Sequence, residues 1–570
     1  MTNKYDCVII GSGFGGSIVA CRLAQEGNAV CVLERGRRWP RTLFPRTPMQ
    51  VATKAFWDLS ARRLGLIEYR AFDRMHVIQG SGVGGGSLHY FNVHIRPPAS
   101  IFDDPRWPDE IDLESLDPYY RVAHDMLDAA PLSAPDGREL PTRTEVFRDA
   151  CRASGRDAEL VNIAVYTGSG RRNPHGGGEQ LPCDYSGNCG FGCATHAKNT
   201  LDLNYLALAE HHGAEVRPLH RAERIEPVRG GYRVRFTHLN PDDPDADAEG
   251  SVVGERVVVA AGTLGSNELL LRCRDVHRTL PKLSPALGCG FSGNGDFLLS
   301  GAQMPCDVDA SSGPSITAGV DWPSPAQEAY IEDLGLPDPV LWLIEGMLAN
   351  ENPLDNLWRW GQLLASERLG IKGATRRISR EREHLLAGGR TRRFLPFLGM
   401  CEDAADGHFV LDRAGSLDLR WSPRASAPNL LELERAMRQL SEALGGVYIQ
   451  SPLWTLDNKT LLTAHPLGGC AMAADAQRGV VDDRGAVHGY GDLFVVDGSI
   501  VPTSLARNPT ATISALAERA AFHMINDREM TVGDEMTPVN YGPDDIEATL
   551  AAGLPLAAAS VVVPNERTDS

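Results

Sequence analysis

The sequence has no uninterrupted apolar run of about 18 residues, the length that a membrane-spanning helix requires. It also has no excess of basic charge, because 74 acidic residues outnumber 56 basic residues and the formal net charge is −18. A general nucleic-acid binder needs a basic surface, so we expect no nucleic-acid partner. No charged-then-apolar leader precedes the first predicted strand, which begins almost at Met1. We therefore expect no secretory signal and a cytoplasmic protein.

The sequence also lacks the closely spaced cysteine pattern of small domains that are stabilised by disulfides. The twelve cysteines are spread through 570 residues, and several, including Cys7, Cys21 and Cys31, lie in apolar segments, which is typical of reduced core residues. A chain of this length is too long for one ordinary core and should divide into at least two domains. A composition of 42% apolar and 23% charged residues indicates a soluble globular protein.

A glycine-rich turn between a predicted strand and a predicted helix is the first pattern that carries chemistry. Gly11, Gly13 and Gly16 follow the apolar run 7–10 and precede a helical pattern at 17–24. In this context Gly11 allows the tight turn, Gly13 lets the backbone approach a pyrophosphate, and Gly16 lets the helix pack on the strand. The phosphates of a dinucleotide then lie on backbone N–H groups at the positive end of the helix.

A second predicted strand, 29–33, ends at Glu34. A carboxylate roughly 20 residues past the glycines accepts hydrogen bonds from a ribose diol and repels a 2′-phosphate. We therefore predict a dinucleotide site formed by Glu34 and the turn 11–16, including Phe14 and Gly15.

A second glycine-rich run lies at 77–92. Its small residues let the backbone pass close to a flat or anionic group, which predicts a second cofactor-facing loop. Read alone, the run is explained equally well by a flexible surface loop. The candidate contacts in it are Gly80, Gly82, Gly85, Gly86, Ser87 and His89.

The order of the patterns predicts a nucleotide-binding domain interrupted by a second domain. An apolar strand at 255–262 returns the chain to the first domain, and a helix at 512–526 closes it. Alternating strands at 408–412 and 417–421 indicate an antiparallel sheet in the second domain. The predicted boundaries are 1–96, 200–289 and 462–527 for the first domain, 97–199 and 290–461 for the second, and 528–570 for a tail.

Residues 359–393 contain ten Lys or Arg against three Glu. In an acidic protein such a stretch could make peripheral contact with an anionic membrane surface or a partner. A solvated helical face is the alternative interpretation.

Two segments near the C-terminal end, 465–470 and 507–512, connect these patterns to a family. The ordered motifs are the glycine triplet with Glu34, the loop 80–87, Ala261-Gly262-Thr263, the His465 motif HPLGGC, Asp497-Gly498-Ser499 and Asn508-Pro509. This order resembles the glucose-methanol-choline flavin oxidoreductases, and most of all the cholesterol oxidase branch, where similar HPLGG and NP segments are found. The resemblance spans nearly the whole chain.

The resemblance implies FAD, oxidation of an alcohol, and an α/β fold in which a Rossmann-type FAD-binding domain carries an inserted α+β substrate domain built on an antiparallel sheet. We expect a bulky apolar secondary alcohol such as a 3β-hydroxysteroid. A sugar or terpenoid alcohol oxidised with a non-oxygen acceptor, and a non-oxidising lyase, are the alternatives. The sequence does not choose between oxygen and an electron acceptor protein, and it does not indicate an oligomeric state. The further expected cofactor contacts are Val216, Ala261, Gly262, Asp497 and Gly498.

Alcohol oxidation needs a proton taken from the hydroxyl and a hydride passed from carbon to flavin. Imidazole titrates near neutral pH and suits the base role, so we predict His465 as the base. Asn508 can donate or accept a hydrogen bond at the same oxygen. Read alone, a histidine is more often structural and an Asn-Pro pair more often a turn; their motifs favour the catalytic interpretation.

Two further expectations come from the resemblance. Some family members carry their flavin covalently on a histidine spaced like His89 after Gly84-Gly85, and others have a histidine there without the bond. The steroid oxidases have an additional pocket carboxylate for isomerisation. Glu402 is available for that role, but nothing around it in the sequence selects it.

Cys183, Cys189 and Cys193 lie close together before an Ala-Lys-Asn segment, and three such thiols could ligate iron. They are similar to the cysteine loop that binds an iron-sulfur cluster in some bacterial glucose dehydrogenases of the family. Similar loops also occur in cholesterol oxidase-like members. A structural role, or zinc with His196 as a fourth ligand, are therefore the alternatives.

Overall fold

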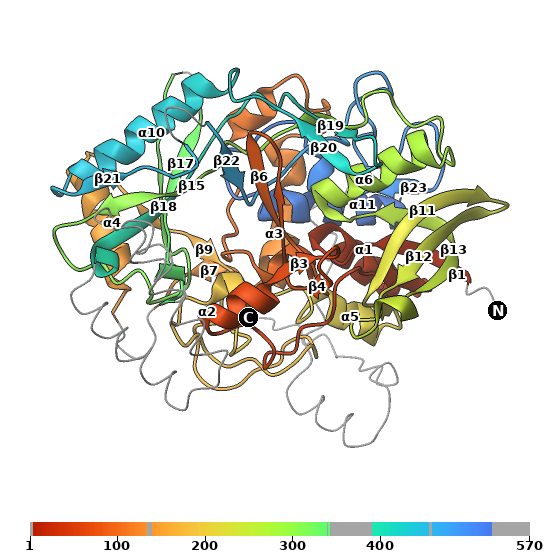
Figure 1. The fold of residues 1–570 in the computed structure, drawn as a ribbon, viewed down its shortest axis with the longest axis horizontal. Coiled ribbons are helices and arrows are strands. Elements are labelled where there is room, and N and C mark those ends of the chain that lie inside the picture. Colours follow the sequence, from red (N-terminus) through yellow and green to blue (C-terminus); the bar gives the residue numbers. More distant parts are fainter. Residues whose placement is uncertain are drawn as a thin grey trace, which may run out of the picture.

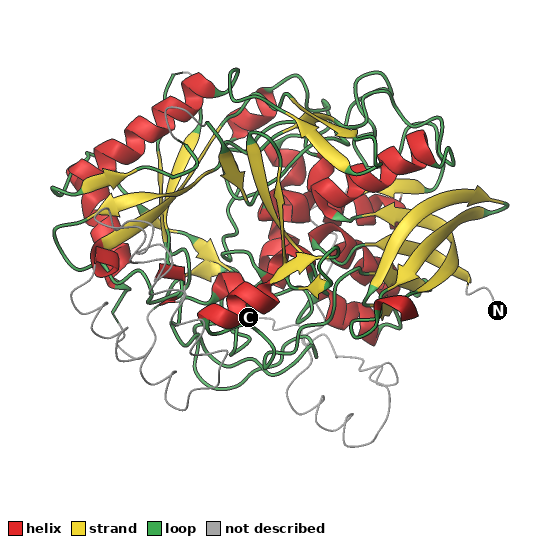
Figure 2. Ribbon diagram, in the orientation of Figure 1, coloured by secondary structure: helices red, strands yellow, loops and turns green. Residues whose placement is uncertain are grey.

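The computed structural model describes residues 4–133, 139–325, 327–338, 340–341, 390–454 and 459–526. Two large sheets lie at opposite ends of the molecule, with a smaller sheet between them (Figure 1). Helices cover both large sheets, and long loops connect the layers (Figure 2).

The first large sheet has seven strands in the order β10-β2-β1-β13-β12-β11, with β23 also paired to β13. The β10, β2, β1, β13 and β23 strands are parallel, whereas β11 and β12 form an antiparallel hairpin on β13. The bounds are β1 Lys4–Ile10, β2 Val30–Leu33, β10 Glu215–Arg217, β11 His220–Val228, β12 Gly231–His238, β13 Ala248–Val259 and β23 Leu493–Val495.

The parallel strands are nearly all buried, as expected of a sheet covered on both faces. The helix α1 (Phe14–Gln25) packs between α5 (Tyr205–His211) and α11 (Thr510–Asn526), and α3 (Leu113–Met126) packs on α11. Arg22 and Glu518 form a buried ion pair between α1 and α11, with two N···O distances of 2.8 Å. Tyr205 Oη donates to the same carboxylate at 2.6 Å. This contact joins helices from the two ends of the chain.

The second large sheet is antiparallel, in the order β21-β15-β18-β17-β16-β8. All eight residues of its strand β18 are buried. The helix α10 (Ala427–Glu442) packs against β15, β18 and β21, and α4 (Thr142–Ala153) contacts β16 and β17. The strand bounds are β8 Glu159–Leu160, β15 Phe297–Gln303, β16 Ala318–Asp321, β17 Ala329–Asp333, β18 Phe394–Cys401 and β21 Val447–Ile449.

The smaller five-stranded sheet, β22-β6-β5-β3-β4, brings two predicted motifs together. The strands β6 (Met75–Gly80) and β22 (Leu461–Thr463) are parallel neighbours with Val77 opposite Thr463. Both therefore end at the same edge, where β6 leads into the second glycine-rich loop and β22 leads into His465. The remaining bounds are β3 Phe56–Asp58, β4 Arg63–Leu64 and β5 Ile67–Ala71, with a separate pair formed by β7 Ala130–Pro131 and β9 Asn162–Ile163.

The strands β19 (Gly407–Leu411) and β20 (Leu417–Arg420), predicted from their alternation, are antiparallel neighbours. They form a three-stranded antiparallel sheet with β14 (Cys289–Phe291), separate from the six-stranded sheet and in contact with α6 (Gly262–Leu271). Alternation indicates which face of a strand is buried, but not which strand is its neighbour.

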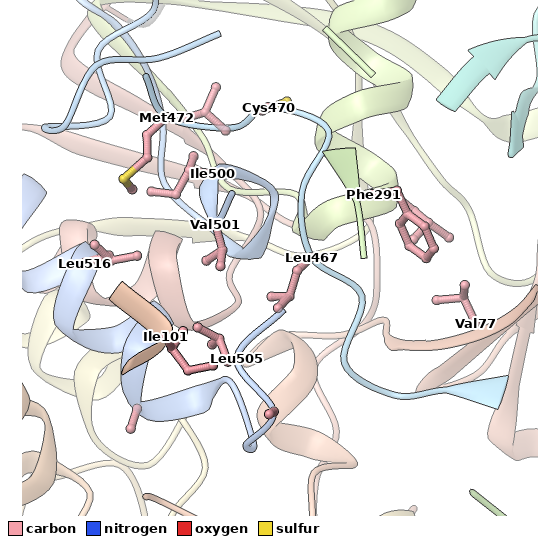
Figure 3. Packing of buried hydrophobic residues seen from close by; sticks show 14 of the residues in the cluster. Val77, Ile101, Phe291, Leu467, Cys470, Met472, Ile500, Val501, Leu505 and Leu516 are labelled. Atoms are coloured by element: carbon pink, nitrogen blue, oxygen red, sulfur yellow. The ribbon is translucent and has the colours of Figure 1, made fainter. Parts of the chain in front are cut away.

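The main hydrophobic core extends from the nucleotide sheet to the loops around the predicted base. Leu467, two residues after His465, is fully buried in it with Phe291, Val501 and Leu505 (Figure 3). The backbone of the HPLGG segment is thus fixed by an apolar side chain of its own.

Several predictions concern properties other than the fold. In the described part of the chain, no helix combines the length and the apolar character needed to span a bilayer. All twelve cysteines are free. The basic stretch 359–393 lies outside the described residues except for 390–393, and so does the tail 528–570. Membrane contact and a cytoplasmic location therefore stay predictions.

Two buried histidines make the fold sensitive to acid. Burial lowers the pKa of His94 to about 3 and that of His175 to about 4, against 6.5 for a free ring. Their neutral rings therefore stabilise the fold fully above pH 6.5, and this contribution falls as the pH drops toward 4 and 3. We expect each of these histidines to lower the free energy of unfolding by about 1.4 kcal/mol when the pH falls from 7.5 to 5.5.

Denaturant unfolding at these two pH values tests the effect with His94→Gln, which stays neutral throughout. The wild type should lose about 1.4 kcal/mol more than the variant on acidification. Parallel losses in the two proteins would contradict the assignment.

Candidate active site

One cavity of about 1670 Å³ connects the predicted motifs. Typical small-molecule sites have volumes of roughly 300–1,000 Å³, so this cavity has room for a dinucleotide and a second molecule. Most of the predicted residues line it, namely Gly11, Gly13, Phe14, Gly15, Glu34, Gly80, Gly85, Gly86, His89, Ala261, Gly262, Asp497, Gly498, His465 and Asn508.

Four predicted cofactor residues do not line the cavity. A Cβ on Gly16 would lie 2.1 Å from Gly11 O, which is the close helix packing expected of that glycine. Gly82 has φ +150° and packs against Leu88 and Trp39. Ser87 Oγ donates to Gly84 O at 2.7 Å, so it stabilises the loop without lining the cavity. Val216 lies in β10, paired with Val32.

The first glycine turn leaves open space at one position. Gly11 has φ +100°, and a Cβ there would lie 2.3 Å from Ala260 O; a Cβ on Gly15 would lie 1.6 Å from Val496 O. Gly13, in contrast, has no heavy atom within 4 Å of an added Cβ. Because Gly13 also lines the cavity, its backbone is accessible to a phosphate in the way that a dinucleotide requires.

Ser12 joins the two glycine-rich loops and Glu34, a role that the sequence reasoning missed. Its hydroxyl donates to Glu34 Oε2 at 2.6 Å and accepts from the Gly84 N–H at 3.1 Å. Glu34 also accepts from the N–H groups of Ser12 and Gly36. The carboxylate is therefore oriented before any ribose is bound. Ser12 occupies a variable position of the motif, so its spacing alone gave no signal.

Asp497 connects the end of β23 with the start of α6. Its carboxylate accepts from Gly262 N at 3.0 Å, Ser266 Oγ at 2.5 Å and Ser499 N at 2.8 Å. Burial raises the pKa of this carboxyl, and the hydrogen bonds oppose that rise. Gly262 and Gly498 are thereby held at the cavity wall.

Lys198 fixes the backbone on both sides of His89. Its buried ammonium donates to Cys189 O at 2.7 Å, Leu88 O at 2.9 Å and Tyr90 O at 3.4 Å. Burial, with a smaller effect from Lys198, lowers the pKa of His89 to about 3. The His89 ring is therefore neutral near pH 7, and covalent attachment of flavin to it stays a prediction.

The cysteine loop gives no support to the metal prediction. Within the described ranges, no group of three or more His, Cys, Asp or Glu side chains is arranged to hold a metal ion. Cys189 Sγ accepts from Asn92 Nδ2 at 3.1 Å, and Cys183 and Cys193 pack against an apolar cluster. Burial raises the pKa of the Cys183 thiol, which disfavours the thiolate that a metal ligand requires.

His465 is paired with a buried carboxylate that the sequence did not indicate. His465 Nδ1 lies 2.8 Å from Asp296 Oδ1, and Asp296 is fully buried. Asp296 Oδ2 accepts from Thr463 Oγ1 and Ala464 N, both at 2.9 Å. Because a carboxylate only accepts, the ring carries its proton on Nδ1 and leaves the Nε2 lone pair available.

Asn508 is paired with a second buried carboxyl group. Its Nδ2 donates to Glu332 Oε2 at 3.2 Å, whereas Asn508 Oδ1 and Glu332 Oε1 are buried without a hydrogen-bond partner among the described residues. Burial raises the pKa of Glu332 well above its usual range, and the hydrogen bond from Asn508 opposes that rise.

Glu332, not Glu402, is therefore the carboxyl group in contact with Asn508. Neither of the two glutamates lines the cavity, and Glu402 Oε2 accepts from the Glu328 N–H at 2.6 Å. The signal for Glu332 was a carboxyl residue directly after the apolar start, 329–331, of the fully buried strand β17.

The arrangement fits the FAD that the resemblance implies. The backbone of Gly13 is accessible, Glu34 is oriented for a ribose, and two loops from different sheets share one cavity wall. Thr510 and Ile513 of the first turn of α11 also line the cavity, so the positive end of that helix favours negative charge there.

Two family models match this chain, both described as GMC oxidoreductase, over residues 5–274 and 423–517. A cholesterol oxidase of Mycobacterium tuberculosis is 29% identical, with 91% of each chain covered. A cholesterol oxidase of Acinetobacter baumannii is 28% identical over 91% of this chain and 94% of its own. A long-chain-alcohol oxidase of Arabidopsis thaliana is 24% identical over 90% of this chain and 66% of its own.

Solved structures share the fold at lower identity. A formate oxidase superimposes with a TM-score of 0.60 at 15% identity, covering 92% of this chain and 99% of its own. A fungal aryl-alcohol oxidase superimposes with a TM-score of 0.58 at 16% identity, covering 92% of this chain and 100% of its own.

Gly13→Ala should weaken FAD binding without affecting the apoprotein. Its φ of −75° suits alanine, and the added Cβ meets no protein atom, so only a bound phosphate would be displaced. We expect the Kd for FAD to rise tenfold or more, about 1.4 kcal/mol. FAD titration by fluorescence and thermal unfolding of the apoprotein measure the two quantities.

Gly491→Ala is the matched control, because its added Cβ also meets nothing and the residue is exposed. It should change neither quantity. An unchanged Kd for Gly13→Ala would contradict the phosphate assignment.

Proposed function

Because the chain belongs to the glucose-methanol-choline (GMC) oxidoreductase family and is an FAD-dependent alcohol oxidoreductase, we propose that it oxidises a bulky, apolar secondary alcohol such as a 3β-hydroxysteroid. The observation that carries this proposal is that the polar pair His465 and Asn508 shares its cavity with one apolar cluster. The cavity-lining members of that cluster include Phe91, Val93, Leu298, Leu334, Leu336 and Leu462.

The proposed base is His465. With Nδ1 donating to Asp296, its Nε2 can accept the hydroxyl proton of the alcohol. The buried carboxylate stabilises the positive charge that the ring gains and keeps the ring oriented. His465 is 15% exposed and lines the cavity, so an alcohol can reach it.

Asn508 is proposed to orient the alcohol oxygen. One N–H of its amide is used by Glu332, which leaves the second N–H for a ligand. The remaining N–H can stabilise negative charge on the oxygen as the proton leaves. When bound, FAD supplies the acceptor for the hydride that leaves the carbon.

The alternatives predict different contacts. A sugar would need several polar partners near His465, whereas an apolar alcohol would pack on the apolar cluster that lines the cavity. Oxygen is proposed as the electron acceptor because the relatives named above are oxidases by name. A dehydrogenase with another acceptor, and a non-oxidising flavoprotein, are separated from this proposal by the experiment below.

Anaerobic reduction of the flavin by a panel of alcohols tests the proposal. Cholesterol should bleach the flavin absorbance, a sugar should not, and air should restore the oxidised spectrum. His465→Ala should retain its flavin and lose the bleaching. Absence of bleaching by any sterol, sugar or terpenoid alcohol would favour the non-oxidising alternative, and bleaching that air does not reverse would favour a dehydrogenase.

Asp296→Asn should inactivate the base by reversing its tautomer. The Ala464 N–H requires an acceptor, so the amide oxygen must face it and the NH₂ group must face His465 Nδ1. The ring would then carry its proton on Nε2 and could not accept another there. We expect flavin reduction to slow by roughly 10² to 10⁴, the range seen when such a carboxylate is neutralised.

Stopped-flow absorbance under anaerobic conditions measures this rate of flavin reduction. The absorbance is followed at 450 nm, near the usual flavin maximum. Thr463→Ala is a comparison variant. It removes one bond to Asp296 and the acceptor of the His465 N–H, but it leaves the carboxylate to accept from Nδ1. It should slow the reaction much less. Equal rates for Asp296→Asn and the wild type would exclude this role of Asp296.

A further inference from the structure

We propose that the turn 292–296 sets the relative position of His465 and Asn508, and that Asn294 is the positioning residue for Asn508. This inference rests on the proposed function, because it concerns the two residues assigned to the alcohol. His465 and Asn508 lie on separate segments, and the same five-residue turn is hydrogen-bonded to both.

Asn294 contacts the segment that leads into Asn508. Its Oδ1 accepts from the Leu505 N–H and its Nδ2 donates to Arg507 O, both at 2.8 Å. Arg507 O belongs to the peptide bond that precedes Asn508, so this hydrogen bond acts one bond away from the residue it positions. Between the two bonded residues, Ala506 has φ +50°, an unfavourable conformation for alanine that needs such contacts to persist.

The two ends of the turn contact the His465 segment. Asp296 accepts from His465 Nδ1, and Ser292 exchanges two backbone hydrogen bonds with Leu467, at 2.9 and 3.0 Å. The turn therefore contacts the base through its side chain and through the backbone that follows it.

The turn itself is rigidly anchored. Asp403, which follows β18, accepts from Ser292 Oγ at 2.7 Å, Gly293 N at 2.9 Å and Gly295 N at 3.2 Å. Gly295 passes so close to Cys401 that an added Cβ would lie 2.0 Å from the Cys401 carbonyl oxygen. Hydrogen bonds from Ser292, Gly293 and Gly295 thus restrict displacement of the turn relative to the substrate sheet.

Asparagine is the side chain that meets all the requirements at position 294. The residue is fully buried with φ +58°, a conformation that asparagine tolerates better than most residues. Leu505 N requires an acceptor and Arg507 O requires a donor, and an amide supplies both in one plane. Aspartate has no donor, and glycine has neither group but adopts the same φ without strain. Asn294→Gly therefore removes the two contacts and leaves the backbone conformation accessible.

A double-mutant cycle with Asn508→Ala separates positioning from general destabilisation. The measurement is the anaerobic rate of flavin reduction by cholesterol in holoenzyme that retains its FAD. We expect Asn294→Gly to slow the reaction tenfold or more in the wild-type background. If it acts through Asn508, it should cause no further loss in the Asn508→Ala background, because coupled residues are not additive.

Asn204→Gly is the matched control, since it removes a buried asparagine that caps α5 and makes no contact with the active-site segments. It should not change the rate in either background. Asn294→Asp is the second variant if the glycine variant folds poorly, because it keeps the acceptor for Leu505 N and loses the donor to Arg507 O. It should also slow the reaction. A wild-type rate for Asn294→Gly, or a loss that multiplies with that of Asn508→Ala, overturns the proposal.

Hydrogen exchange tests the same link without turnover. In Asn294→Gly the peptide 503–508 should exchange faster, because the Leu505 N–H loses its acceptor, whereas Asn204→Gly should leave it unchanged. Unchanged exchange in Asn294→Gly overturns the positioning role. A wild-type enzyme that no alcohol reduces overturns the proposed function instead, and leaves the exchange experiment to decide the link.

Discussion

The hydrogen bond between Asp296 and His465 is the contact on which the proposed chemistry depends. It joins residues 169 positions apart in the sequence, and it determines which ring nitrogen is available to a substrate. The same carboxylate accepts from Thr463 and Ala464, so it also shapes the loop on which the imidazole lies. Tautomer, ring orientation and loop conformation therefore all follow from one buried charge.

Buried carboxylates have the same function at other points around the cavity. Glu34, Asp403 and Asp497 each accept from backbone N–H groups and hydroxyls of segments distant in the sequence. Burying a charge is unfavourable unless such hydrogen bonds compensate it, and charge-assisted bonds are among the stronger ones. Part of the cavity wall consists of loops that connect strands and helices, and these carboxylates accept hydrogen bonds from several of those loops.

The parts of the site that depend on local spacing could be predicted from the sequence. The turn 11–16 and Glu34 follow from the order of strand, glycines, helix and strand, and His465 and Asn508 follow from motifs. Ser12, Asp296 and Glu332 could not be predicted, because their partners lie far along the chain and no spacing connects them. For the same reason the sequence indicated β19 and β20 as strands but not β14 as their neighbour. Three neighbouring cysteines suggested a metal, whereas in the structure Cys183 and Cys193 pack against an apolar cluster and burial raises the pKa of the Cys183 thiol.

The ion pair between Arg22 and Glu518 has a consequence for how the protein is made. The two residues are 496 positions apart, and the helices that carry them cover the same sheet. At about 5–20 residues per second, a ribosome needs roughly 25–100 seconds to add α11 after α1 has been synthesised. During that interval the apolar face of α1 lacks its partner helix. A helix that is translated early is thus completed late, and until then the nascent chain exposes apolar surface of the kind that chaperones shield.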